Sequence, residues 1–289
     1  MKLPVEPHAN RVLFIIIIFT SIVQISISQN TGNPADDFAT SGSYHIVYCN
    51  ANSTTNNQAA YLQTLLPTAW NYLHELFQDI PQGVTSRHGY AAFFKTHQNL
   101  EAVRQVYQDI LDGPDVPTSA GPGTPVRLTP PTIVCVNAGE PDTYRFHEYC
   151  SRPAIRGSMV AGVPAHTGIV FLCPQFFRLP RIPRPGSCPR MDYAINQFAV
   201  ADNGLELGRN QFAILVHEIA HVYLQERGFG GELETYGIQE AVALNASASY
   251  TNAMNYAFYA AAIQADCTEF PSPPIGPGQQ MPPLSGPMY

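Results

Sequence analysis

Charged residues are scarce in this sequence, and basic ones are the scarcer kind. Lys, Arg, Asp and Glu make up 13% of the 289 residues, whereas 45% are hydrophobic. A chain of this composition can bury a core, so charge-driven disorder is excluded for most of its length. The formal net charge is -7, and no basic stripe is interleaved with aromatic residues. Nucleic acid is therefore excluded as an expected partner.

No apolar run in the chain is typical of a membrane-spanning helix. The longest, residues 12–19, follows Lys2 and Arg11 and soon gives way to polar residues. It is short for a span but matches the hydrophobic region of a signal peptide, which small residues follow at the cleavage site. We therefore predict a signal peptide over residues 1–28 and a secreted, extracellular protein without stable membrane insertion.

The sequence also lacks any Cys-x-x-Cys pair, the spacing of structural zinc clusters, so such a cluster is excluded. Six cysteines remain beyond the signal peptide: Cys49, Cys135, Cys150, Cys173, Cys188 and Cys267. An even number of cysteines in an oxidising compartment predicts disulfide bonds, but the sequence leaves their pairing open. Sequons at Asn52 and Asn245 predict glycosylation if the chain is secreted.

The apolar pattern predicts more helix than strand. Helical spacing occurs at about residues 58–80, 100–111 and 210–224, and an Ala-rich stretch predicts one long helix over about 234–265. Pro67 is expected to break or kink the first of these helices. Two short apolar runs bounded by turn residues predict strands, at residues 132–136 and 168–172.

These elements predict an α+β fold in which N-terminal helices precede a small mixed sheet. We expect one domain over residues 29–268, with a helical part to about residue 130 and a catalytic part over 131–268. The Pro-rich tail, 269–289, is predicted to be disordered. No dibasic processing site marks a boundary, so removal of a pro-segment from residues 29 to about 140 stays open.

One motif carries chemistry, the sequence His217-Glu218-Ile219-Ala220-His221. On a helix, residues four apart project from one face, so His217 and His221 can share a zinc ion. Glu218 lies beside them and can accept a proton from water that zinc has acidified. Apolar residues flank the motif, and polar groups on a buried helix are costly unless they have partners. The motif therefore predicts a zinc site rather than a chance pair of core histidines.

Downstream of this helix, the chain resembles the deuterolysin-like, or aspzincin, zinc metallopeptidases of fungi. Gly230 and Tyr236-Gly237 match the two ends of that family's Gly-Thr-x-Asp-x-x-Tyr-Gly motif, and Asn252-Ala253 begins a stretch like its Asn-Ala-x-x-Tyr-x-x-Phe. The resemblance covers about residues 211–261. It implies a zincin-like fold, an active-site helix, a third zinc ligand from the downstream motif, and a tyrosine, Tyr236, that hydrogen-bonds the developing oxyanion.

The chain departs from this family at the third ligand. The family's ligand Asp aligns with Leu233, which cannot bind zinc, while Glu232 and Glu234 flank it. If the segment is helical, Glu232 shares a face with Tyr236 and Glu234 does not, which favours Glu232 as the ligand. Glu234 and, one turn beyond Tyr236, Glu240 stay open as alternatives.

The sequence thus predicts a secreted, monomeric zinc metalloendopeptidase that binds one Zn²⁺ per chain through His217, His221 and Glu232. Glu218 would be the general base, Tyr236 would assist, and the substrate would be a protein or peptide. An endopeptidase is favoured because nothing resembles an element that binds a chain terminus. Two alternatives are an inactive secreted zinc-binding protein or antigen of the same fold, and a structural protein with a coincidental motif. Substrate preference is left open.

Overall fold

The computed structural model describes residues 38–49, 57–118, 126–136, 144–151, 153–154, 157–164, 167–184, 187–192, 197–199, 205–228 and 234–270. The predicted signal peptide, the sequon at Asn52, the favoured ligand Glu232 and all but the first two residues of the predicted tail lie outside this part of the chain. Within the described ranges, no helix combines the length and the apolar character that crossing a membrane requires.

The largest sheet has five strands in the order β1-β2-β5-β9-β8. Their bounds are Phe38–Ser41 (β1), Tyr44–Val47 (β2), Thr132–Cys135 (β5), Ile169–Leu172 (β9) and Ala161–Gly162 (β8). The three central strands β2, β5 and β9 are parallel, whereas β1 and β8 run antiparallel at the two edges. The strands predicted at 132–136 and 168–172 are therefore present as the neighbours β5 and β9, at the centre of a mixed sheet.

Among the described residues, three antiparallel strand pairs lie outside this sheet. They are β3–β4 (Val116–Thr118 and Arg127–Thr129), β6–β7 (Pro153–Ala154 and Gly157–Ser158) and β10–β11 (Arg190–Asp192 and Gln197–Ala199). Of these pairs, β3–β4 lies next to the helix that carries the His-Glu-x-x-His motif, since β3 contacts that helix.

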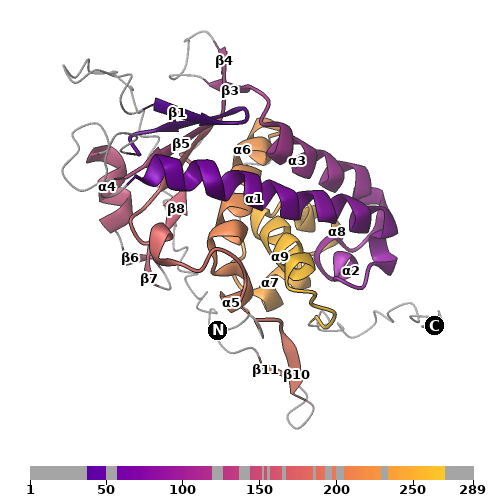
Figure 1. Cartoon of the computed structure of the whole chain (residues 1–289). Helices are drawn as coiled ribbons and strands as arrows, with labels where there is room; N and C mark the ends of the chain where they lie inside the picture. Colours follow the sequence, from indigo (N-terminus) through magenta and orange to yellow (C-terminus); the bar gives the residue numbers. More distant parts are fainter. Residues whose placement is uncertain are drawn as a thin grey trace, which may run out of the picture.

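Helices make up most of the remaining structure. The longer ones are α1 (Gln58–Asp79), α3 (Leu100–Asp112), α6 (Gln211–Glu226) and α9 (Ala253–Gln264), and the shorter ones are α2 (Tyr90–Phe94), α4 (Tyr144–Ser151), α5 (Leu205–Gly208), α7 (Ile238–Ala243) and α8 (Ala246–Ser249). Three 3₁₀ turns cover Ile80–Thr85, His97–Asn99 and Phe176–Arg178. Figure 1 shows α1 running from beside the sheet across the helical part of the molecule. The α+β class predicted from the sequence is confirmed.

Pro67 does not break the first helix, so that part of the prediction is wrong. Helix α1 continues through Pro67 for another three turns. Pro67 lies on the exposed face of α1, so the carbonyl group that loses its helical partner can be solvated. The apolar face, which includes Leu62, Leu66 and Leu73, is fully buried and holds the helix together by packing.

The long helix predicted over 234–265 is instead three helices, α7, α8 and α9. Asparagines stand at both breaks, and Asn245 caps α8 by accepting a hydrogen bond from the backbone N–H of Ala248 at 2.8 Å. Asn252 directly precedes α9. Asparagine side chains compete for backbone groups and favour helix starts over helix interiors. The Ala-rich composition favours helix throughout this stretch, and for that reason neither break was predicted.

Helices α6 and α9 form the centre of the core. Both are almost entirely buried, and they pack against each other along their length. Ala260, Ala261 and Ala262 of α9 are among the buried residues of this core. Helix α6 also contacts α3, β8 and β9, so it is wedged between the helical part and the sheet. This position makes α6 a rigid support for the side chains on its surface.

Three disulfide bonds use all six cysteines: Cys49–Cys135, Cys150–Cys173 and Cys188–Cys267. The first joins the segment after β2 to the end of β5, on either side of the boundary placed near residue 130. The third fixes the chain just after α9. Phe270, in the predicted tail, packs against Phe93 with ring centroids 5.2 Å apart.

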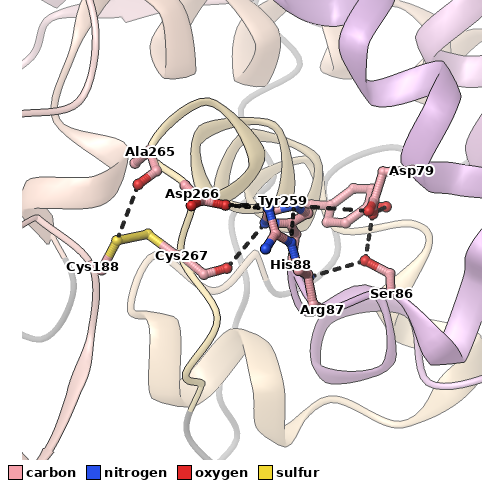
Figure 2. Close-up of polar contacts among 9 residues, drawn as sticks. All are labelled: Asp79, Ser86, Arg87, His88, Cys188, Tyr259, Ala265, Asp266 and Cys267. Carbon is pink, nitrogen blue, oxygen red and sulfur yellow. Dashed lines mark hydrogen bonds and ion pairs between the residues drawn. A yellow bond between two sulfur atoms is a disulfide. The ribbon is translucent and has the colours of Figure 1, made fainter. Parts of the chain in front are cut away.

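A buried polar cluster ties the end of α1 to α9 (Figure 2). The Asp79 carboxylate is 6% exposed and accepts hydrogen bonds from the hydroxyls of Ser86 and Tyr259. The Nδ1 atom of His88 lies 3.2 Å from the carbonyl oxygen of Cys267, next to the third disulfide. Segments far apart in the sequence are thus joined through polar groups that are largely buried.

Replacing Asp79 with alanine is expected to lower the free energy of unfolding by about 3 kcal/mol. The change leaves the hydroxyls of Ser86 and Tyr259 buried without their acceptor, and each such group costs about 1–3 kcal/mol. Asp115→Ala is the control, because that aspartate is exposed and lies outside the cluster. Urea unfolding measures both variants. Equal stabilities for the two variants would contradict this account of the cluster.

Candidate metal centre

Helix α6 begins at a defined cap and presents its polar residues in the core. The Asn210 side chain accepts a hydrogen bond from the backbone N–H of Ala213 at 2.9 Å, which fixes the first turn. Along the helix, most residues are buried in apolar contacts. His217 and Glu218 are also buried, at 8% and 7% exposed, and His221 is partly buried. The helix predicted over 210–224 is therefore confirmed, with its motif inside it.

Three potential metal ligands meet at one point: His217, His221 and Glu234. One ligand atom from each lies within 4.8 Å of the other two. The Glu234 Oε1 atom is 3.0 Å from His221 Nε2 and 3.5 Å from His217 Nε2. The two imidazole rings are perpendicular, with centroids 4.7 Å apart. Both rings therefore turn the same nitrogen toward the same carboxylate.

The three donors fit a zinc ion in type, and the distances from Glu234 to the two histidines also fit it in spacing. Zinc is bound by imidazole nitrogen and carboxylate oxygen at about 2.0–2.2 Å, so donors of a tetrahedral site lie about 3.4 Å apart. The separations of 3.0 and 3.5 Å bracket that value. Within the described part of the chain, the Glu234 Oε1 atom is buried and has no hydrogen-bond donor. A cation between the histidines would satisfy it.

The electrostatics of the cluster favour the ligand forms of two of its groups, His217 and Glu234. Burial lowers the pKa of His217 to about 4, even though Glu234 acts in the opposite direction. Burial would raise the pKa of Glu234, but His217, His221 and a hydrogen bond with Tyr236 together lower it to about 2. At neutral pH, His217 is thus uncharged and Glu234 is ionised, as metal binding requires. For His221, burial acts to lower the pKa, but the hydrogen bond and the charge of Glu234 raise it, so a metal ion would have to displace a proton from this residue.

Glu218 also points toward this site, but it is not one of the three potential metal ligands. Its Oε1 atom is 3.9 Å from His217 Nε2, beyond hydrogen-bonding distance. Burial raises the pKa of Glu218, and with the opposing effects of His221 and of the Glu234 charge included this pKa is about 8. The two carboxyl groups therefore differ strongly in acidity, which is how neighbouring acids are given separate roles.

Comparisons with known proteins give structural likenesses but no match in sequence. No protein-family model matches the chain, and no curated protein matches it. Among solved structures it resembles a zinc peptidase from Grifola frondosa, with a TM-score of 0.43 and 17% sequence identity over 74% of this chain and 98% of that chain. At this similarity no activity can be transferred, so the chemistry has to be inferred from the residues of the site.

Tyr236 lies at the open side of the cluster. Its side chain is 49% exposed, and its ring centroid is 6.1 Å from that of His217. A hydrogen bond links it to Glu234, and burial with the charge of Glu234 raises the pKa of its hydroxyl. A phenol so placed stays protonated at neutral pH and can donate a hydrogen bond to a molecule at the site.

For the third ligand, the sequence favoured one glutamate and left two others open. The favoured Glu232 lies outside the described residues, so its position is not tested. The open alternative Glu234 joins the two histidines. Residues 234–236 are not helical, since α7 begins only at Ile238. The assumption of a helical face, which disfavoured Glu234, is therefore wrong for these residues.

Glu240, the other alternative, has a structural partner of its own. Its Oε2 atom accepts a hydrogen bond from the backbone N–H of Gly237 at 3.1 Å. This contact caps the first turn of α7. Glu240 is also exposed and does not belong to the group of residues that could hold a metal.

Proposed function

We propose that this chain is a secreted zinc metalloendopeptidase that binds one zinc ion through His217, His221 and Glu234. The observation that carries the proposal is the convergence of these three side chains beside Glu218. Three protein donors leave a position open for water or substrate, which is the arrangement of catalytic rather than structural zinc sites. The choice of Glu234 replaces the sequence-based choice of Glu232.

Each residue of the site has a distinct part in hydrolysis. When bound, zinc would act as a Lewis acid, make water more acidic and favour the ionised form of Glu218. Glu218, adjacent to the ligand nitrogen of His217, accepts a proton from the attacking water and delivers it to the leaving amine. Tyr236 donates a hydrogen bond to the carbonyl oxygen of the substrate as negative charge develops on it.

The proposed setting follows from the cysteines and the N-terminus. Three disulfide bonds are typical of an oxidising compartment, and the N-terminal sequence is typical of a signal peptide. The partly exposed site suits a protein or peptide substrate. We expect the mature protein to act as a monomer outside the cell, with Asn245, which is exposed, as a glycosylation site.

Removal of the metal is expected to abolish peptide cleavage, and zinc is expected to restore it. The purified protein would be assayed on a denatured protein substrate before chelation, after dialysis against a chelator, and after addition of one equivalent of zinc. Magnesium serves as the control, because this donor set of two imidazoles does not suit it. Cleavage that persists after complete metal removal would contradict the proposal.

A further inference from the structure

The segment that carries Glu234 is not held by a helix of its own. Residues 234–236 are irregular in structure, and Glu234 lies on them eight residues beyond the end of α6. A ligand on an irregular segment needs other contacts to fix it, because a metal site depends on the orientation of its donors. The residue directly after Glu234, Thr235, is where these contacts are made.

The side-chain amide of Asn252 makes two hydrogen bonds with Thr235. The backbone N–H of Thr235 donates to Asn252 Oδ1 at 3.3 Å, and Asn252 Nδ2 donates to Thr235 Oγ1 at 3.1 Å. A side-chain amide is well suited to this task, since it offers an acceptor and a donor in one plane. Asn252 is only 6% exposed, so water does not compete strongly for these bonds.

Asn252 is itself held in place by a second side-chain amide, that of Asn255. Its Nδ2 atom donates to Asn255 Oδ1 at 2.8 Å, and Asn255 is fully buried. Asn255 Nδ2 in turn donates to the carbonyl oxygens of Phe93, at 2.7 Å, and Ser249, at 2.9 Å. The chain of hydrogen bonds thus runs from the helical core, through two asparagines, to the residue next to the proposed zinc ligand.

We propose that Asn252 is a positioning residue of the metal centre, holding Glu234 toward His217 and His221 through its paired hydrogen bonds with Thr235. The inference rests on the proposed function, because it assigns Asn252 a role toward the ion held there. Gly237 is tied to Glu240 at the other end of the segment, so residues 234–237 are fixed at two points. The backbone that carries Glu234 is therefore largely ordered before metal binds.

The test measures zinc affinity by competition with a chromophoric chelator. Asn252→Leu removes both hydrogen bonds, and its zinc affinity is expected to fall about tenfold or more, as for other partners that orient metal ligands. Thr235→Val removes only the hydroxyl and should weaken binding less, whereas Thr235→Ser keeps the hydroxyl and should restore the wild-type affinity. Asn57→Ala is the control, because it removes an asparagine cap of α1.

The visible absorption of bound Co²⁺ supplies a second readout, since it reports coordination geometry. We expect an altered spectrum for Asn252→Leu and Thr235→Val and a wild-type spectrum for Thr235→Ser and Asn57→Ala. If Asn252→Leu does not fold, the valine and serine variants of Thr235 decide. Wild-type affinity and spectrum in Thr235→Val and Asn252→Leu, with one zinc bound, would overturn the inference alone. A wild-type protein that binds no zinc would overturn the proposed function and this inference together.

Discussion

Replacing Glu218 with glutamine is expected to abolish peptide hydrolysis while the protein keeps its zinc. Glutamine preserves the shape of the side chain but cannot accept a proton from water. General acid–base catalysis by a positioned group contributes about 10²–10⁴-fold to a rate, so kcat should fall by at least this range. Glu218 is not one of the three donors that meet at the site, and zinc content should therefore stay at the wild-type value.

The experiment pairs hydrolysis of a peptide substrate with elemental analysis of the same sample. Glu75→Gln is the matched control, because it makes the same change at an exposed position of α1. Full activity in Glu218→Gln would exclude the general-base role. A wild-type protein that contains zinc but cleaves no peptide would favour the alternative of an inactive zinc-binding protein.

Replacing Glu234 with alanine is expected to remove the zinc. The change takes away one of three protein donors and leaves His217 and His221 without the carboxylate that lies 3.5 and 3.0 Å from their Nε2 atoms. Loss of a group that merely orients a ligand costs about 10–100-fold in affinity, and loss of the ligand itself should cost more. Competition with a chelator of known affinity measures the difference.

Two further variants identify the ligand among the glutamates of this region. Glu232→Ala should bind zinc as the wild type does, and Glu240→Ala should lose only the cap of α7, with a small fall in stability. The assignment of Glu234 would be wrong if Glu232→Ala lost zinc while Glu234→Ala kept it. That result would restore the ligand favoured by the sequence.

The sequence predicted the centre of the site because its signal there is local. A helix with His217 and His221 four residues apart can be recognised from spacing alone. The buried strands β5 and β9 were found for a similar reason, as short apolar runs between turn residues. The parallel pairing of β2 with β5 could not be found this way, since it joins segments that are distant in the sequence. Strand β1 was missed although its pairing with β2 is local.

The sequence did not favour Glu234, the proposed third ligand, because the position of this residue depends on tertiary contacts. Glu234 lies on a segment whose course is set by Asn252, which is far along the chain, and not by a helical repeat. The sequence did contain a signal, since asparagines at helix boundaries indicate caps or breaks. Applied to Asn245 and Asn252, that rule would have divided the long predicted helix.

The most direct test of the zinc site is diffraction from crystals of the zinc-loaded protein, measured on either side of the zinc absorption edge. A single anomalous peak is expected, about 2.0–2.2 Å from the Nε2 atoms of His217 and His221 and from a carboxylate oxygen of Glu234. No peak between the two histidines, or a peak there without Glu234 among its ligands, would contradict the account.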